Sequence, residues 1–264
     1  MSGRRDGAIS TGMLPDTPII RVVDLETTGA RAGSDGVVEI GWQDVERIGG
    51  AWRIGAERGA RYVDPERPIP ARTQAVHHIL DADVAGAPNW LSVAPGVLDP
   101  PGRPLMALAA HRAAFERRWC RDALTGRRPW ICTYKCALRL WPDEPSHANQ
   151  ALRYARNPEG LDRRAGLPAH RAGPDAYVTA HLLREMLREA PVEALLAWTR
   201  EPALLPRVTF GEHRGRRWDT MSDAFLADVL RRGGFDADIR YTARHEQSVR
   251  ALRPDPAGPP SLLL

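Results

Sequence analysis

The chain has 264 residues, which is enough for one large hydrophobic core and a smaller accessory module. It contains no apolar run of membrane-spanning length and no apolar segment after its charged start, so we expect a cytoplasmic protein with no membrane partner. The net charge of +4 supports a nucleic-acid partner only weakly, because nearly all the cationic side chains are arginines, as codon usage in a GC-rich genome alone would produce. The three cysteines lack a zinc-binding spacing and are expected to be reduced thiols.

The first part of the chain predicts three strands followed by short helices. Residues 1–16 have the composition of a loose tail. The predicted strands span residues 18–24, 36–45 and 51–63. Gly49-Gly50 predicts the turn between the last two strands. A helix is predicted to begin near Thr73, whose hydroxyl would cap it, and residues 89–98 predict a second short helix or a loop.

Two acidic residues end the first predicted strand. Because side chains alternate along a strand, Asp24 and Glu26 point to the same side, and Gly29 lets the chain turn after them. Two carboxylates at the end of a core strand repel each other and lose hydration, which a cation between them would relieve. Hard oxygen ligands with no cysteine nearby favour Mg²⁺ or Mn²⁺. An isolated pair of this kind is more often a solvated strand end, so the metal hypothesis needs further ligands.

A second acidic position follows another apolar run. Residues 105–110 predict a buried strand, and residues 112–124 predict a helix with Phe115 and Trp119 on its apolar face. Glu116 lies near the start of this helix. The helix dipole alone would also favour an acid there.

The third acidic position lies at the start of a long helix. A strand over 130–132 and helices over 134–140, 147–156 and 174–189 complete a predicted mixed sheet flanked by helices. Asp175 lies in the first turn of the last helix, and His170 lies in the loop before it. With His170 outside the helix, both side chains can converge on one point. Taken alone, each residue is more often an ordinary surface histidine or an acid favoured by the helix dipole.

Together, these acids and the histidine predict a phosphodiester-hydrolysing site with two divalent cations. The predicted metal ligands are Asp24, Glu26, Glu116 and Asp175. Two cations held by carboxylates can bind the scissile phosphate, activate a water molecule and stabilise the leaving oxygen. A nearby histidine can take the proton from that water, which is the role expected for His170.

The order of these motifs resembles the DEDDh 3′→5′ exonucleases. The chain shows Asp-x-Glu at Asp24, His-x-x-x-Phe-acid at His111, and His-x-x-x-x-Asp at His170. The segments 69–79 and 146–150 also resemble parts of this family, in the style of exonuclease X. The resemblance covers roughly residues 18–190 and implies an α/β, ribonuclease H-like fold with a mixed five-stranded sheet.

The resemblance also implies a role for each matching residue. Asp24 would bridge both cations, Glu26 and Asp175 would hold one, and Glu116 would help to position the other. His170 would be the general base. The implied substrate-binding residues are Leu25, Thr27, Thr28, His111 and Phe115. For Phe115, a place in the hydrophobic core is an equally good explanation.

Two positions depart from the family pattern. The family usually has aspartate where this chain has Glu116, and asparagine where it has Arg112. Glutamate still offers two oxygens, but its side chain is one methylene longer, so the second cation would shift by about an ångström or the backbone would have to compensate. The departure affects the expected rate and metal preference more than the reaction class.

The C-terminal part predicts a separate small module. We expect a catalytic domain over 17–195, a linker over 196–207, a module over 208–252 and a tail over 253–264. A hairpin-like element and two helices, over 222–232 and 240–251, would form the module around a miniature core with Trp218 and Phe225. Arginines at 214, 216 and 217 fit contact with DNA and fit equally a module that packs on the catalytic domain or on a protein partner.

The sequence therefore predicts a metal-dependent enzyme that hydrolyses DNA from its 3′ end, with single-stranded 3′ ends as the expected substrate and two cations, Mg²⁺ or Mn²⁺, as cofactors. The first alternative is an exoribonuclease similar to RNase T or oligoribonuclease, which would have to accommodate the 2′-hydroxyl. The second alternative is a non-catalytic nucleic-acid-binding module whose site has degenerated at Glu116.

Overall fold

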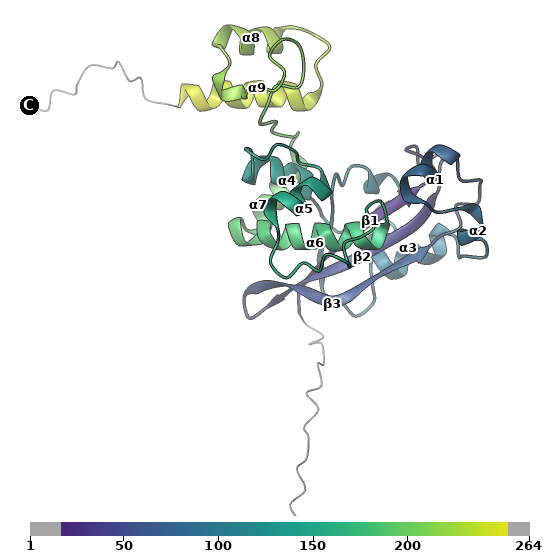
Figure 1. Ribbon diagram of the computed structural model, residues 1–264. Coiled ribbons are helices and arrows are strands. Elements are labelled where there is room, and N and C mark those ends of the chain that lie inside the picture. The colour runs from purple at the N-terminus through teal and green to yellow at the C-terminus, as the bar shows by residue number, and fades with distance from the viewer. Residues whose placement is uncertain (1–16, 253–264) are drawn as a thin grey trace, which may run out of the picture.

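A five-stranded mixed sheet forms the centre of the larger domain (Figure 1). The computed structural model describes residues 17–252, so both predicted tails lie outside the described residues. The strands are β1 (Ile19–Thr27), β2 (Val37–Ile48), β3 (Ala51–Tyr62), β4 (Leu105–Ala110) and β5 (Trp130–Cys132). They lie in the order β3-β2-β1-β4-β5, with β1 antiparallel to β2 and parallel to β4. The predicted mixed five-stranded sheet is thus confirmed.

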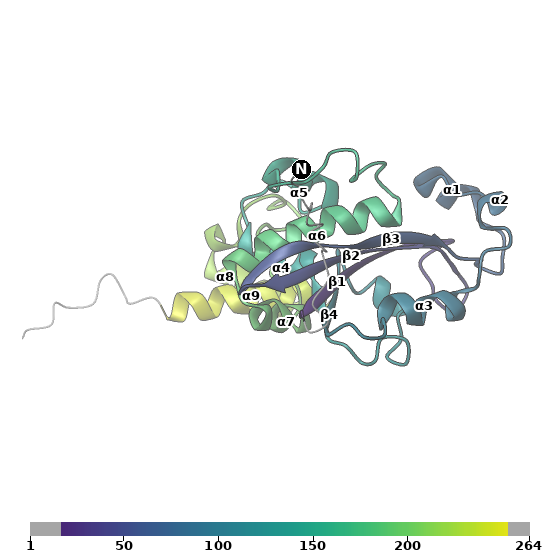
Figure 2. The ribbon, with the colours of Figure 1, turned by 90° about the horizontal axis from the view of Figure 1, so that it is seen from below.

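Helices cover both faces of this sheet (Figures 1 and 2). The helices of the larger domain are α1 (Ala71–His77), α2 (Asp81–Val84), α3 (Trp90–Leu98), α4 (Thr133–Leu140), α5 (Asn149–Arg156), α6 (Ala172–Glu189) and α7 (Val192–Arg200). Ile20 and Val22 of β1 pack in the core beneath α4 and α6, whereas Val23 packs in the core beside α3. Because side chains alternate along β1, Asp24 and Glu26 lie on the α6 side.

Gly41 of β2 lets α6 approach the sheet where Asp24 lies. The two residues are paired across the β1–β2 ladder. A Cβ atom on Gly41 would lie 2.1 Å from the carbonyl carbon of Ala172, at the start of α6. Since that neighbour is backbone and not the end of a flexible side chain, only glycine permits this spacing. The close approach brings Asp175, in the first turn of α6, over the end of β1.

The helix predicted over residues 112–124 is wrong. After β4 the chain makes consecutive turns, and only Glu116–Arg118 form a short 3-10 helix, η1. Arg112 has a left-handed φ of 67°, which a right-handed helix cannot contain. The ring centroids of Phe115 and Trp119 nevertheless lie 4.9 Å apart, in the core beside α3. The apolar spacing that predicted a helix face therefore reflects aromatic side chains that pack together from tight turns.

Two further details differ from the sequence prediction. The hydroxyl of Thr73 donates to the carbonyl of Pro70 at 2.9 Å instead of capping α1, which begins at Ala71. The predicted linker starts inside α7, where Leu195 is fully buried in the core beneath α4. The irregular connection between α7 and the module therefore spans residues 201–207. The division of the chain into independent domains stays a prediction.

Residues 208–252 enclose a hydrophobic core of their own. A turn closed by an isolated bridge between Arg207 and Arg217 precedes η2 (Trp218–Thr220), α8 (Asp223–Arg231) and α9 (Ala237–Ala251). Trp218 is fully buried, and its ring centroid lies 6.0 Å from that of Phe225, so the predicted miniature core is confirmed. Across residues 17–252, no helix has the length and apolar character needed to cross a membrane.

Candidate active site

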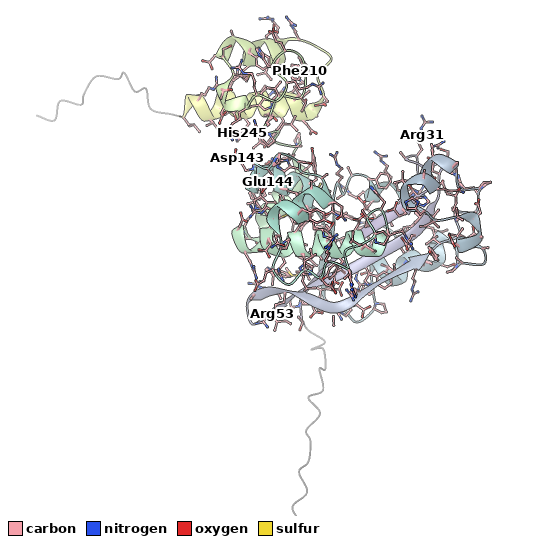
Figure 3. The ribbon with its side chains drawn as sticks, in the orientation of Figure 1. Arg31, Arg53, Asp143, Glu144, Phe210 and His245 are labelled. Atoms are coloured by element: carbon pink, nitrogen blue, oxygen red, sulfur yellow. The ribbon has the colours of Figure 1, made fainter. Side chains whose placement is uncertain are left out.

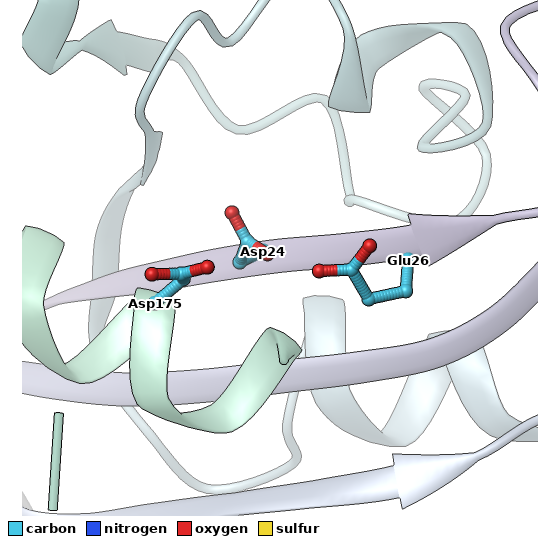
Figure 4. A group of neighbouring side chains, drawn as sticks. All are labelled: Asp24, Glu26 and Asp175. Carbon is cyan, nitrogen blue, oxygen red and sulfur yellow. The ribbon is translucent and has the colours of Figure 1, made fainter. Parts of the chain in front are cut away.

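Three carboxylates converge where β1 approaches the start of α6 (Figure 4). Asp24 and Glu26 project from β1, and Asp175 projects from the first turn of α6. Each offers an oxygen, and these oxygens lie within 4.8 Å of one another. The alternation of side chains along β1 correctly placed the first two acids together, and the packing of α6 on the sheet adds the third.

Burial and mutual repulsion make this cluster hard to ionise. Burial, and then the negative charges of Glu26 and Asp175, raise the pKa of Asp24 well above its ordinary value. Burial and the charge of Asp175 raise the pKa of Glu26 to about 8. Burial also raises the pKa of Asp175, although a hydrogen bond from Gln150 opposes the shift. Carboxylates held this way are stabilised by protons or by cations.

Glu116, in the segment that follows β4, is the fourth acid of the site. It lies at the start of η1, is 3% exposed, and its Oε2 has no hydrogen-bond partner among residues 17–252. Burial raises its pKa to about 8, and its charge in turn raises the pKa of Asp24. Glu116 lies outside the 4.8 Å group of Asp24, Glu26 and Asp175, but it is electrostatically part of the same site. A buried carboxylate oxygen without a partner is unusual, and a cation would satisfy it.

Asp175 is oriented by two hydrogen bonds. The side-chain amide of Gln150 donates to Oδ1 at 2.6 Å, and the backbone N–H of His170 donates to Oδ2 at 2.7 Å. The side-chain amide of Asn149 also donates to the carbonyl of Asp175 at 3.2 Å. Gln150 was not among the predicted site residues, although it lies in a segment that resembles the exonuclease family. Its amide holds one ligand oxygen of Asp175 in place.

His170 lies exposed beside this cluster, in the loop before α6, and hydrogen bonds fix the residues that follow it. The side chain of the next residue, Arg171, donates to the carboxylate of Glu39 from Nε at 3.0 Å and from Nη2 at 2.6 Å. The backbone N–H of Ala172 donates to the same carboxylate at 2.9 Å. Glu39 is 3% exposed and lies opposite Glu26 in the β1–β2 ladder. The sequence prediction missed Glu39, whose signal is an acid in the middle of the apolar run over residues 37–41 at the start of β2.

A cleft of about 620 Å³ opens next to the acids. Its lining includes Leu25, Glu26 and Thr27 from β1, His77 from α1, and Phe115 from the turn after β4. Three of the five predicted substrate-binding residues therefore line one hollow beside the acidic cluster. A nucleotide-sized ligand fits a cleft of this volume.

The other two predicted substrate-binding residues make contacts within the protein. The backbone N–H of Thr28 donates to the carbonyl of Gly36 at 2.9 Å, and its hydroxyl accepts from the N–H of Gly36 at 3.0 Å. In His111, Nδ1 lies 3.0 Å from the hydroxyl of Thr133, and Nε2 lies 2.9 Å from the carbonyl of His147. Burial lowers the pKa of His111 to about 4, so the neutral ring donates from Nε2 to that carbonyl. A direct contact of either residue with substrate stays a prediction.

The donor set fits divalent cations. The four acids supply only hard carboxylate oxygens, which suit Mg²⁺ and Mn²⁺. Two features point to bound cations: the raised pKa values of the buried acids, and the partnerless Oε2 of Glu116. An acidic cluster of this kind beside a nucleotide-sized cleft suits a metal-dependent enzyme that hydrolyses phosphodiester bonds.

Comparison with known proteins agrees with this class. The exonuclease family model RNase_T matches residues 22–183, which contain all four acids and His170. Exodeoxyribonuclease 10 of Escherichia coli (strain K12) is 34% identical over 200 residues, covering 75% of this chain and 83% of that protein. A DNA polymerase III subunit epsilon-like protein of Rhodobacter capsulatus is 41% identical over 155 residues, covering 53% of this chain and 20% of that protein.

A solved structure of exonuclease X in complex with 5′ overhanging duplex DNA is also similar. It is 33% identical, with a TM-score of 0.56, and the match covers 68% of this chain and 99% of that one. The chain therefore belongs to the RNase T-type exonuclease family. Within that family it is a DEDDh-type 3′→5′ exonuclease, as the motif order predicted.

Proposed function

We propose that this enzyme removes nucleoside 5′-monophosphates from the 3′ ends of DNA with the help of two divalent cations. The observation that carries the proposal is the convergence of Asp24, Glu26 and Asp175 within 4.8 Å, next to the nucleotide-sized cleft. DNA as the substrate is supported by two comparisons, one with an exodeoxyribonuclease and one with an exonuclease solved in complex with duplex DNA.

The acids would divide the two cations between them. Asp24 receives the negative charge of all three other acids and would ligate both cations. Glu26 and Asp175 would ligate one of them, and Glu116, with its partnerless Oε2, would ligate the other. When bound, the cations would neutralise the scissile phosphate and stabilise the leaving oxygen. Gln150 would keep the carboxylate of Asp175 in its ligating orientation.

His170 would accept the proton of the attacking water. Its backbone is fixed because its N–H donates to Asp175, and because Arg171 is anchored on Glu39. Its imidazole is exposed and has no hydrogen-bond partner among residues 17–252. A histidine with a fixed backbone and a free ring can reach a water molecule beside Asp175 and act as a general base.

The terminal nucleotide would lie in the cleft. Backbone groups near Leu25 and Thr27 would contact its sugar and base, and the ring of Phe115 would lie against it. These contacts would place the scissile phosphate at the acidic cluster, because Glu26 lines the cleft and belongs to the cluster. Positioning of this kind accounts for a large share of rate acceleration in hydrolases.

The test is digestion of matched single-stranded DNA and RNA, labelled at the 3′ or the 5′ end, with Mg²⁺, Mn²⁺ or EDTA. We expect 5′-labelled DNA to shorten stepwise, 3′-labelled DNA to release labelled mononucleotide at once, and EDTA to abolish both. Faster digestion of RNA would favour the exoribonuclease alternative. Binding without cleavage by the purified enzyme, in either metal, would favour the non-catalytic alternative.

A further inference from the structure

Two hollows meet at a stacked pair of side chains between the larger domain and the module. The guanidinium carbon of Arg112 lies 4.0 Å from the centroid of the Tyr134 ring. This pair lines a hollow of about 200 Å³ together with Arg117 and Ala203. It also lines a hollow of about 260 Å³ together with Arg207. Ala203 and Arg207 belong to the connection between α7 and the module, so both hollows lie where the two parts of the chain meet.

These hollows begin on the far side of the turn that carries Glu116. Phe115 lines the cleft beside the acidic cluster, whereas Arg112 and Ala114 of the same turn line the smaller hollow. Glu116 follows directly and is buried toward the acids. A strand whose last nucleotide lies in the cleft, and whose next phosphate lies at the acids, therefore reaches the hollows by crossing this one turn.

The arginines of this region are available to an anion. The guanidinium of Arg112 makes no hydrogen bond or ion pair with any residue from 17 to 252, and neither does that of Arg117. Arg112 also has the left-handed φ of 67°, a conformation that costs energy in a residue other than glycine. Arg207 donates to the carbonyl of Gly215 at 3.0 Å and forms no ion pair with an acid of residues 17–252.

Three carboxylates lie near the hollows, and two of them are paired with arginines. Asp238 accepts from the N–H of Ala203 at 2.7 Å, and Glu144 pairs with Arg156 at 3.4 Å. Asp143 forms an ion pair with Arg217 of the module. Figure 3 shows Asp143 and Glu144 on the side of the larger domain that faces the module. Glu144 and Asp143 are therefore neutralised by arginines outside the hollows, and Asp238 is the one acid of residues 17–252 that lines the smaller hollow, which also holds Arg112 and Arg117.

The stacking surface is held in place by contacts within the larger domain. The ring of His111 meets the Tyr134 ring edge-on, with centroids 5.9 Å apart. Both nitrogens of His111 are held, one by Thr133 and the other by the carbonyl of His147. A fixed aromatic face next to unpaired guanidinium groups is the combination that binds bases by stacking and phosphates by charge.

We propose that Arg112 and Tyr134, with Arg117 and Arg207, form a subsite for the substrate strand upstream of the scissile bond. A base would stack against the Arg112–Tyr134 pair, and neighbouring phosphates would lie on the arginines. The module contributes to this subsite through its connection and thus helps to hold longer DNA. This inference rests on the proposed function and adds to it the path that the substrate DNA follows across the protein.

The test compares a dinucleotide with a single strand of about ten nucleotides, long enough to reach a second site. Arg112→Asn removes the charge while keeping a residue that tolerates left-handed backbone. Arg127→Asn is the matched control, because Arg127 is exposed, has a left-handed φ of 58° and lines neither hollow. For the longer strand we expect Arg112→Asn to raise KM roughly tenfold with kcat unchanged, and to reduce the salt slope by about one.

The same variant should leave dinucleotide cleavage unchanged, and Arg127→Asn should leave both substrates unchanged. Tyr134→Leu should raise KM for the longer strand, whereas Tyr134→Phe should not, since only the ring face is used. Equal effects of Arg112→Asn on both substrates, or no effect on either, would overturn the subsite. Failure of the unaltered enzyme to digest DNA would instead count against the proposed function.

Discussion

Replacing Glu116 with glutamine should stabilise the metal-free enzyme although it removes a proposed metal ligand. Burial raises the pKa of Glu116 from 4.5 to about 8, so folding at pH 7 must protonate a carboxyl group that is ionised in the unfolded chain. The gap of 2.5 pH units between pH 7 and 4.5, at about 1.4 kcal/mol per unit, gives an upper limit of about 3 kcal/mol. The glutamine amide would itself lack a partner, which costs about 1–3 kcal/mol, so we expect a net gain of about 1–2 kcal/mol.

The stability difference between the two proteins should depend on pH. Because the folded pKa is the higher one, the stability of the unaltered protein should fall as pH rises from 4.5 towards 8. The difference between the two proteins should therefore be small near pH 4.5 and largest near pH 8. Thermal unfolding in EDTA, followed by circular dichroism, should show a rise in Tm of roughly 2–8 °C at pH 7.

Glu66→Gln provides the control, because Glu66 is exposed and outside the cluster. Saturating Mg²⁺ should reverse the order, since the unaltered protein gains more from the cation than the variant does. If the Glu116→Gln protein is less stable than the unaltered protein in EDTA at every pH, burial does not disfavour the ionised form of Glu116.

Three other outcomes follow from the site and the module. Asp24→Asn should abolish hydrolysis without loss of secondary structure, because the acid is proposed to ligate both cations; residual cleavage in a rigorously purified protein would count against the two-cation site. His170→Ala should lower kcat roughly 10²–10⁴-fold while KM stays similar, and an unchanged kcat would mean that another group is the base. A chain ending at Pro202 should still cleave a dinucleotide and bind longer DNA more weakly with a shallower salt dependence; an unchanged salt slope would favour a module that binds a protein partner.

Strand patterns predicted the part of the site that depends on local geometry. Asp24 and Glu26 are two residues apart on a strand, so their common side follows from alternation alone. Asp175 and His170 were joined to them because their residue types suit a two-cation site and because the motif order resembles a family, since no local rule brings the start of α6 to the end of β1. The spacing is set by contacts between residues far apart in the chain, such as Gly41 and Ala172.

The wrong helix prediction and the two missed residues also depend on contacts between segments far apart in the chain. The apolar spacing of Phe115 and Trp119 is compatible with a helix and with turns that bury both rings, and only the left-handed backbone of Arg112 decides between them. The contribution of Gln150 depends on how α5 lies against α6, and that of Glu39 on the pairing of β1 with β2. Helix periodicity carries no information about either arrangement.

The close contact at Gly41 predicts that a position can be essential to this nuclease without contributing any atom to its chemistry. Even the single methyl group of alanine would push against the backbone of α6 and carry Asp175 away from Asp24. In a saturation-mutagenesis screen for nuclease activity, this glycine would tolerate as few replacements as the ligands themselves. Because the obstacle is main chain, no smaller side chain elsewhere could compensate. A variant at Gly41 that lost activity would therefore show that the distance between the sheet and α6 had changed, although every catalytic side chain was still present.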